Sequence, residues 1–392
     1  MEEVEPLWMG LDLGTQSLKV ALLPDEAGAP PVYLDSVVFS RDLPQYNTSH
    51  GMHTSDGEDG EENAVVTSPV SMWLEALDMG LARLQASEGG RGRLTRVKGM
   101  SVSGQQHGTV YWKEGAEQQL KGLAGCDPRA TLTEALAGCF ARRDCPIWAD
   151  SSAVRECEAL SRELGGPLEV AKATGSAPYP RFSGNQASSS IVARIARREP
   201  QVYSACERVS LVSSFVASVL LGRYAPIDSS DGSGMNLMDI RSKAWHTAAL
   251  QATGAAGLER KLGLLGPPTK VLGPASAFFC RKFGLSPACV VASGSGDNPC
   301  ALVGLGLGVG VGAGGGGCEL GHERYGHGDH QDPCASGRGP CHGGPHGPRH
   351  LLLRHACLQE WLAGARADAR RGVRRLGGRC RRVLGGVRPG PL

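Results

Sequence analysis

The amino-acid composition changes abruptly near residue 317, and this break limits how much of the chain can form an ordinary globular core. Residues 1–317 contain 28 Lys and Arg against 33 Asp and Glu, a net charge of −5. Residues 318–392 contain 13 Arg, no Lys and 6 acidic residues, a net charge of +7, together with 7 of the 11 His. Because one folded domain rarely changes its residue usage so sharply, we treat the two parts separately.

Charge and hydrophobic content exclude several classes of protein. The net charge of +2 gives no excess of basic groups for a nucleic acid, and a hydrophobic fraction of 41% is too high for a wholly disordered chain. The first residues are acidic where a secretory leader is basic. The uncharged segment 298–318 is long enough to span a bilayer, but its many glycines disfavour a helix. We therefore expect a cytoplasmic protein that binds neither nucleic acid nor membranes.

Strands and helices alternate over residues 7–305. Apolar runs at 7–13 and 19–23 flank the polar turn Gly14-Thr15-Gln16-Ser17 and predict a hairpin. A hairpin followed by alternating strands and helices predicts an α/β domain with a mixed sheet. The other predicted elements are strands at 31–39, 97–103, 109–112 and 290–292, a helix capped by Ser68 with Pro69 as its first residue, helices at about 132–140, 151–164 and 186–198, a strand end and buried helix within 209–221, and a polar loop at 226–234.

The first candidate site combines Asp12, near the end of a predicted buried strand, with the turn Gly14, Thr15, Gln16 and Ser17. Backbone N–H groups and hydroxyls in such a turn can cradle a phosphate, and the acid can hold Mg²⁺ through water. From these residues alone, an ordinary hairpin in which Asp12 caps the turn is the alternative.

Two further candidates lie where predicted strands end. His107 stands between glycines after the strand at 97–103, and Asp297 and Asn298 lie at a strand-to-helix junction. Ligands of α/β sheets gather at such junctions, where Asp297 could act as a general base. The structural alternatives are a helix cap for Asp297 and a hydrogen bond to a loop carbonyl for His107.

Five short motifs follow one another along residues 7–305, namely Asp12–Ser17, Gln105–Gly108, Tyr179–Gln186, Ile227–Gly234 and Gly296–Pro299. Their order and content resemble the FGGY family of carbohydrate kinases, and five ordered matches are far more specific than any single one. Within that family the chain is similar to the animal branch that phosphorylates D-xylulose. The segments that carry this narrower resemblance are Arg41–Pro44, Thr67–Val70 and Ser210–Phe215.

The resemblance implies a fold of two ribonuclease-H-like domains of the actin and hexokinase type, with sugar and ATP in the cleft between them. It implies an N-terminal domain over residues 7–284 and the start of a C-terminal domain over 285–305. It also implies that D-xylulose is converted to D-xylulose 5-phosphate with ATP and Mg²⁺. In this scheme Asp297 is the base, and the sugar contacts His107, Arg181, Asp297 and Asn298. Asp12, Gly14, Thr15, Gln16 and Ser17 face the phosphate and its Mg²⁺, with no metal held directly in a cage of protein side chains.

Residues 306–392 lack three features that the resemblance leads us to expect: a Gly-Thr-Ser phosphate turn, an adenosine-binding Gly-Gly segment and the FGGY signature. We therefore expect a second domain that is largely missing, a disordered Gly-, Arg-, His- and Cys-rich tail, a monomer, and weak or no kinase activity. The tail is either a segment translated outside its frame or a lineage-specific extension. The alternatives for the whole chain are a kinase for another ketose or polyol, and a non-catalytic sugar-binding remnant.

Overall fold

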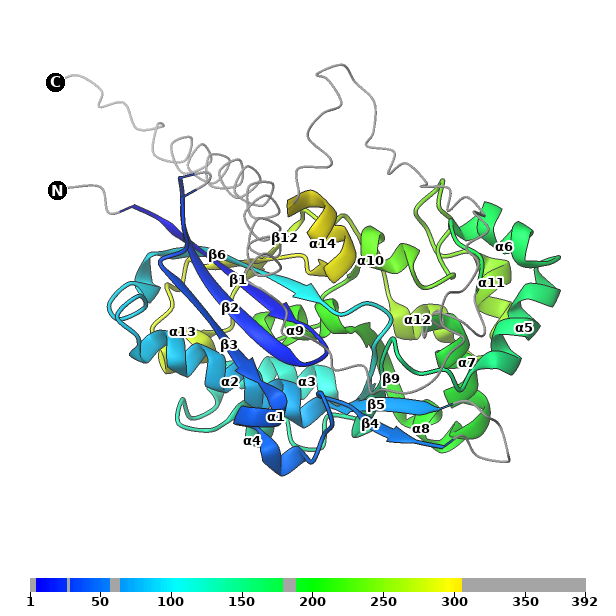
Figure 1. The fold of residues 1–392 in the computed structure, drawn as a ribbon, viewed down its shortest axis with the longest axis horizontal. Coiled ribbons are helices and arrows are strands. Elements are labelled where there is room, and N and C mark those ends of the chain that lie inside the picture. The colour runs from blue at the N-terminus through cyan, green and yellow to red at the C-terminus, as the bar shows by residue number, and fades with distance from the viewer. Residues whose placement is uncertain (1–4, 27–28, 57–63, 179–187, 305–392) are drawn as a thin grey trace, which may run out of the picture.

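A mixed β-sheet forms the centre of this computed structural model, which describes residues 5–26, 29–56, 64–178 and 188–304 (Figure 1). The strands lie in the order β12-β13-β6-β1-β2-β3, and β14 also pairs with β6. The expected α/β class with a mixed sheet is confirmed, because β1 pairs with β2 in antiparallel and with β6 in parallel orientation. The bounds are β1 (Leu7–Leu13), β2 (Ser17–Pro24), β3 (Tyr33–Val38), β6 (Val97–Gly104), β12 (Val271–Pro274), β13 (Val290–Ala292) and β14 (Ser295–Gly296).

The N-terminal hairpin forms where the apolar runs predict it. All residues of β1 are buried, as a continuous apolar run in the middle of a sheet requires. The turn is closed by a 3.0 Å hydrogen bond from the Gly14 N–H to the carbonyl of Ser17. The register pairs Leu13 with Leu18 and Asp12 with Lys19, so the Asp12 side chain lies beside that of Lys19.

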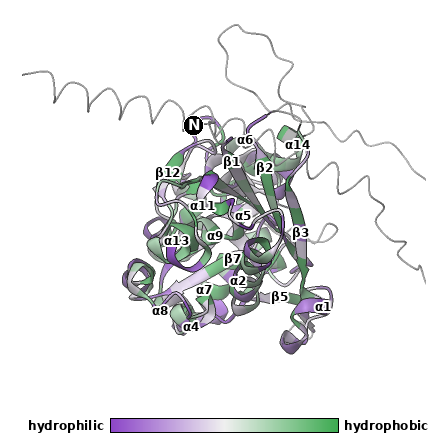
Figure 2. Cartoon of the chain, turned by 90° about the vertical axis from the view of Figure 1, so that its left-hand side faces the viewer, coloured by the Kyte–Doolittle hydropathy of each residue, from purple (hydrophilic) through white to green (hydrophobic). Residues whose placement is uncertain are grey.

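Two helices cover the sheet and contribute to the core around it. Helix α2 (Val70–Ala86) packs against β2 and β3, and α9 (Val212–Leu221) packs against β6 and β13. All ten residues of α9 are buried, and its three serines satisfy their hydroxyls with hydrogen bonds inside the protein. Figure 2 shows hydrophobic residues concentrated in these interior strands and helices.

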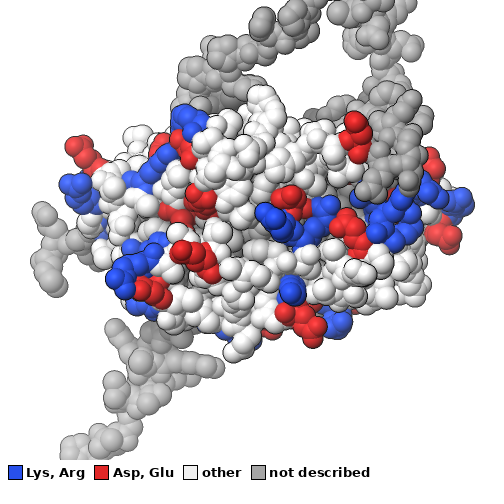
Figure 3. All heavy atoms as spheres, turned by 90° about the horizontal axis from the view of Figure 1, so that it is seen from below, with Lys and Arg blue, Asp and Glu red and all other residues white. Residues whose placement is uncertain are grey.

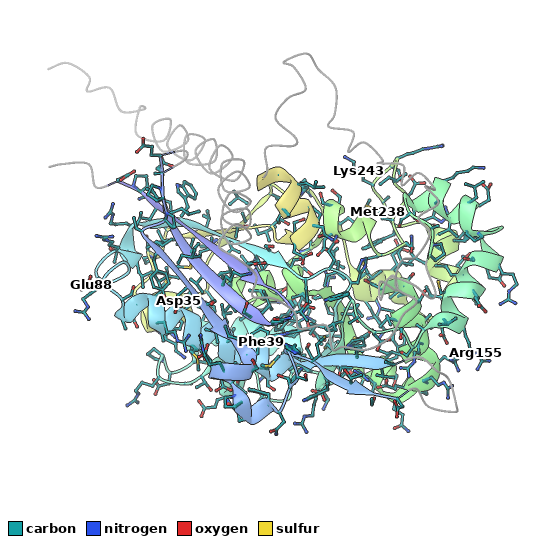
Figure 4. All side chains as sticks on the ribbon, in the orientation of Figure 1. Asp35, Phe39, Glu88, Arg155, Met238 and Lys243 are labelled. Atoms are coloured by element: carbon teal, nitrogen blue, oxygen red, sulfur yellow. The ribbon has the colours of Figure 1, made fainter. Side chains whose placement is uncertain are left out.

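Smaller sheets and helices surround this centre, and Glu88 and Arg155 lie at opposite ends of the long axis (Figure 4). The small sheets are β4 (His53–Ser55), β5 (Val65–Pro69) and β8 (Asp144–Pro146), then β7 (Thr109–Lys113) with β9 (Cys206–Leu211), and β10 (Ile227–Asp228) with β11 (Leu265–Gly266). The remaining helices are α1 (Phe39–Asp42), α3 (Ala116–Gly122), α4 (Leu132–Ala135), α5 (Val154–Glu163), α6 (Pro167–Thr174), α7 (Ser188–Arg198), α8 (Pro200–Ala205), α10 (Ser229–Ser233), α11 (Thr247–Ala252), α12 (Leu258–Leu262), α13 (Ala277–Phe283) and α14 (Asp297–Gly304).

Three predicted elements are wrong in detail. Ser68 and Pro69 end β5 instead of starting α2, and the Ser68 hydroxyl donates to the carbonyl of Gly51 at 2.8 Å. The helix expected at 132–140 is a single turn, because Gly138 adopts a φ of +77° and Phe140 forms a bridge with Trp112. The loop expected at 226–234 contains β10 and α10.

Several expectations concern residues outside the described part of the chain, among them Arg181 and residues 306–392. The domain boundary expected after residue 284 stays a prediction, although β13 pairs with β6 in the central sheet.

Within the described ranges, no helix has the length and apolar character needed to cross a bilayer. On the face shown in Figure 3, acidic and basic side chains are interspersed.

Candidate active site

The candidate residues meet at one edge of the central sheet, where three parallel strands end together. The register pairs Leu13 of β1 with Gly104 of β6, and Gly104 with Gly296 of β14. The residues that follow these positions therefore converge at the carboxyl ends of the strands, the usual ligand-binding edge of an open α/β sheet. Figure 1 shows α14 beside the end of β6 and near α10.

Asp297 and Asn298 are the first two residues of α14, at the strand-to-helix junction that the sequence predicts. The Asp297 carboxylate is half-buried and accepts a 2.9 Å hydrogen bond from the Asn298 N–H. The exposed Asn298 side chain donates to Oε1 of Gln106 at 2.7 Å. This bond joins two of the five motifs and fixes the start of α14 against the loop that follows β6.

His107 lies in the same loop, with a left-handed backbone at φ +64°. Burial lowers the pKa of its imidazole to about 4, although a hydrogen bond to the backbone of Gly234 opposes this shift. The ring is therefore neutral near neutral pH. A neutral imidazole can donate one hydrogen bond and accept another, which suits an uncharged polyhydroxyl ligand.

Asp12 is buried and its Oδ2 lies 2.9 Å from the ammonium of Lys19. Lys19 is not part of any of the five sequence motifs, although the cross-strand register of the hairpin places it opposite Asp12. The chemistry of a phosphate cradle fits this corner, since it offers a carboxylate, a cation and the turn that follows Leu13. Within the described residues, no cluster of three or more His, Cys, Asp or Glu side chains is arranged to hold a metal ion.

The turn itself is held by side chains from two other parts of the chain. The indole N–H of Trp148 donates to the Thr15 hydroxyl at 2.8 Å, and that hydroxyl lies 3.3 Å from Oε1 of Gln105. The Gln105 side chain is buried, and among the described residues its Nε2 has no hydrogen-bond partner. This leaves a donor next to the turn, another feature suited to phosphate oxygens. Trp148 and Gln105 lack a sequence signal that would connect them to the turn.

Of the other turn residues, Gln16 is exposed and its carbonyl accepts from the N–H of Phe39, while Ser17 starts β2. Gly14 does not adopt a positive φ, and a β-carbon there would meet only the Ser17 carbonyl oxygen, at 3.6 Å. The turn therefore does not need glycine for its backbone conformation. Apart from that oxygen, the space beside Gly14 is open.

Two buried carboxyls lie behind Asp297. Asp228 caps α10 and accepts hydrogen bonds from the Ser230 N–H at 2.8 Å and the Ser295 hydroxyl at 3.1 Å. Burial raises its pKa to about 7. For Asp231, burial and the neighbouring Asp228 raise the pKa well above its usual value. Neither carboxyl could be predicted from the sequence as part of the site, because this segment is rich in turn-forming residues and predicts a polar loop.

Comparison with known proteins agrees with the resemblance in the sequence motifs. Residues 143–304 match the N-terminal domain of the FGGY family of carbohydrate kinases. The xylulose kinase of Rattus norvegicus is 43% identical over 297 residues, which are 76% of this chain and 52% of that protein. Xylulose kinase 2 of Arabidopsis thaliana is 41% identical over 301 residues, 77% of this chain and 51% of that protein. The chain thus spans about half the length of the curated relatives it matches.

Solved structures agree on the fold. A xyloylose kinase from Brucella ovis superimposes with a TM-score of 0.56 at 21% identity, over 76% of this chain and 50% of that one. The xylulose kinase of Bifidobacterium adolescentis gives a TM-score of 0.53, also at 21% identity, over 77% of this chain and 55% of that one. The expected ribonuclease-H-like fold of the actin and hexokinase type is confirmed for the described residues.

Proposed function

The chain belongs to the FGGY family of carbohydrate kinases, and we propose that it forms the sugar-binding half of an enzyme that transfers phosphate from ATP to D-xylulose. The observation that carries this proposal is the junction of Asp297 and Asn298 with the loop that holds Gln106 and His107. A carboxylate, an amide and a neutral imidazole belong to residues that follow the ends of these strands, and this set of groups suits a polyhydroxyl substrate. The product would be D-xylulose 5-phosphate.

Asp297 is the proposed base. Phosphoryl transfer has a loose transition state, so positioning and neutralisation of phosphate charge supply most of the catalysis. A carboxylate beside the attacking hydroxyl accepts its proton, a contribution of about 10²–10⁴-fold. His107 and Asn298 would orient the sugar through hydrogen bonds, as would Arg181, which lies outside the described residues.

ATP and Mg²⁺ are the proposed cofactors. Asp12, with Thr15 and the N–H groups of the turn, would hold the phosphates and the hydrated cation, and Lys19 and the Nε2 of Gln105 would add donors. When bound, Mg²⁺ would neutralise phosphate charge. Residues 306–392 contain none of the expected adenosine-binding motifs. We therefore also propose that residues 1–392 phosphorylate D-xylulose slowly. A cytoplasmic location and a monomeric state remain predictions from the sequence.

Formation of ADP in the presence of D-xylulose tests this proposal. Residues 1–392 should form ADP slowly but measurably at high protein concentration, and Asp297→Asn should lower the rate about 10²-fold. Asp239→Asn is the matched control, because Asp239 is an exposed carboxylate whose hydrogen bonds, within the described residues, come from its own turn residues Arg241 and Ser242. An Asp297→Asn rate equal to that of the control would remove Asp297 from the role of base. Faster turnover with another ketose or polyol would reassign the substrate.

A further inference from the structure

Asp231 packs against Gly296, the last residue of β14, which immediately precedes Asp297. Its side chain is 2% exposed, and its Oδ2 accepts a 2.6 Å hydrogen bond from the Ser213 hydroxyl. Its other oxygen, Oδ1, has no hydrogen-bond partner among the described residues. A β-carbon placed on Gly296 would lie 2.8 Å from this Oδ1. The carboxyl therefore packs on the backbone of the residue that immediately precedes Asp297.

A second carboxyl supports the neighbouring residue of the same strand. Asp228 is fully buried and accepts a 3.1 Å hydrogen bond from the hydroxyl of Ser295. It also accepts from the backbone N–H of Asp231, at 3.3 Å. Both residues of β14 thus rest on acidic side chains of the segment that caps and forms α10.

Among the described residues, the titratable groups that interact electrostatically with Asp231 carry no positive charge. They are the carboxyls of Asp228 and Asp297 and, from α14, the thiol of Cys300. In the described part of the chain, neither Asp228 nor Asp231 forms an ion pair with a basic side chain. Two adjacent buried carboxyls without a counter-ion cannot both ionise without a large cost in free energy. One of them must keep its proton near neutral pH.

We propose that Asp231 is a positioning residue for Asp297: as a neutral carboxylic acid it supports the end of β14 through Gly296 and keeps a second negative charge away from Asp297. The inference rests on the proposed role of Asp297 in sugar binding and proton transfer. Burial and the neighbouring Asp228 carboxyl raise the pKa of Asp231, which agrees with a neutral carboxylic acid at this position. Asp231 touches no substrate in this account and acts only through its neighbour.

A double-mutant cycle on D-xylulose affinity tests the connection to Asp297. Calorimetric titration would compare the full chain with Asp231→Ala, Asp297→Ala and the double variant. Asp231→Ala should weaken binding about 10-fold in the wild-type background and less than about 2-fold in the Asp297→Ala background, because residues in contact are not additive. Asp231→Asn, a neutral isostere, should restore affinity to within about 2-fold. Equal losses in both backgrounds, or no rescue by Asn, would overturn the inference.

The serine that holds Asp231 offers a matched pair of variants. Ser213→Ala removes the hydroxyl that donates to the Asp231 carboxyl, whereas the adjacent Ser214 donates to the carbonyl of Leu211. Both serines are buried near the start of α9. Ser213→Ala should reduce D-xylulose affinity in the same direction as Asp231→Ala, while Ser214→Ala should leave it unchanged. Equal effects of the two serine variants would contradict the inference.

Infrared spectroscopy tests the proton without any sugar. The wild-type chain near neutral pH should show the carbonyl stretch of a buried carboxylic acid, which Asp231→Asn should remove and Asp297→Ala should keep. If the spectrum of Asp231→Asn kept this band, Asp231 would not be the protonated carboxylic acid. If the wild-type chain failed to bind D-xylulose, the proposed function would fail, and the infrared comparison would still decide the state of Asp231.

Discussion

The ammonium of Lys19 lies 2.9 Å from Oδ2 of Asp12, and the two residues face each other across the first hairpin. Both side chains are mostly buried, at 17% and 8% exposure. The acid expected to face phosphate and Mg²⁺ therefore already has a fixed cation beside it. The pairing also explains how β1 tolerates a carboxylate in an otherwise apolar and fully buried strand.

Replacing Lys19 should destabilise the fold. Lys19→Met would leave the buried Asp12 carboxylate without its ammonium partner, a loss of about 1–3 kcal/mol in the free energy of unfolding. Urea denaturation measures this change. Lys98→Met is the matched control, because Lys98 is an exposed lysine on strand β6 of the same sheet. Equal losses for the two variants would show that the ion pair contributes nothing.

His107 should make the stability of the protein depend on pH. Burial lowers its pKa to about 4, whereas a histidine in an unfolded chain titrates near about 6.5. Between these values the unfolded state binds more protons, so the free energy of unfolding should fall as the pH falls from about 6.5 to about 4. His107→Asn should reduce this slope by the contribution of one titrating group. Asparagine also tolerates the left-handed backbone at this position. Denaturation curves across this pH range measure it, and identical slopes would contradict the assignment.

Trp148 should report ligand binding at the turn. Its indole is 36% exposed and hydrogen-bonded to Thr15, whereas Trp8, Trp73 and Trp112 are buried. A ligand that covers the turn should therefore change the fluorescence of Trp148 more than that of the buried tryptophans. Titration with ATP or D-xylulose should change the emission of the wild type, and Trp148→Phe should lose most of that change. A full response in Trp148→Phe would place the ligand elsewhere.

Gly14→Val should separate the phosphate side of the site from the sugar side. The variant should fold almost normally, because Gly14 has no positive φ and its β-carbon would meet only one oxygen at 3.6 Å. Its branched side chain should nevertheless block the space beside the turn. The apparent KM for ATP should rise and turnover should fall, with D-xylulose affinity unchanged. A loss confined to sugar affinity would show that this turn does not hold phosphate.

Long, strongly patterned elements could be predicted from the sequence, and short ones could not. The apolar runs of β1 and β2 predict the hairpin, and Val212–Leu221 is apolar enough to predict a buried helix. The turn of α10 could not be predicted, because Ser229–Ser233 favours turns locally. It forms a helix because Asp228 caps it and because Ser213 and Ser295 from other elements hold its acidic side chains.

The site was predictable as a set of positions but not as a network. Asp12, His107 and Asp297 each follow or end a predicted strand, and parallel pairing brings those strand ends together. The bonds from Trp148 to Thr15 and from Asn298 to Gln106 span 133 and 192 residues of sequence. No local pattern encodes such contacts, since they depend on the tertiary arrangement of the whole sheet edge.

Binding of D-xylulose to the purified chain tests the central claim most directly. Isothermal titration of D-xylulose into residues 1–392 should give saturable binding at one site. His107→Ala and Asp297→Ala should each weaken it about 10-fold or more, the loss expected when a hydrogen-bonding partner of the sugar is removed, and Asp239→Asn should leave it unchanged. Absence of saturable binding, or binding that neither substitution weakens, would contradict the assignment of this strand edge as the sugar site.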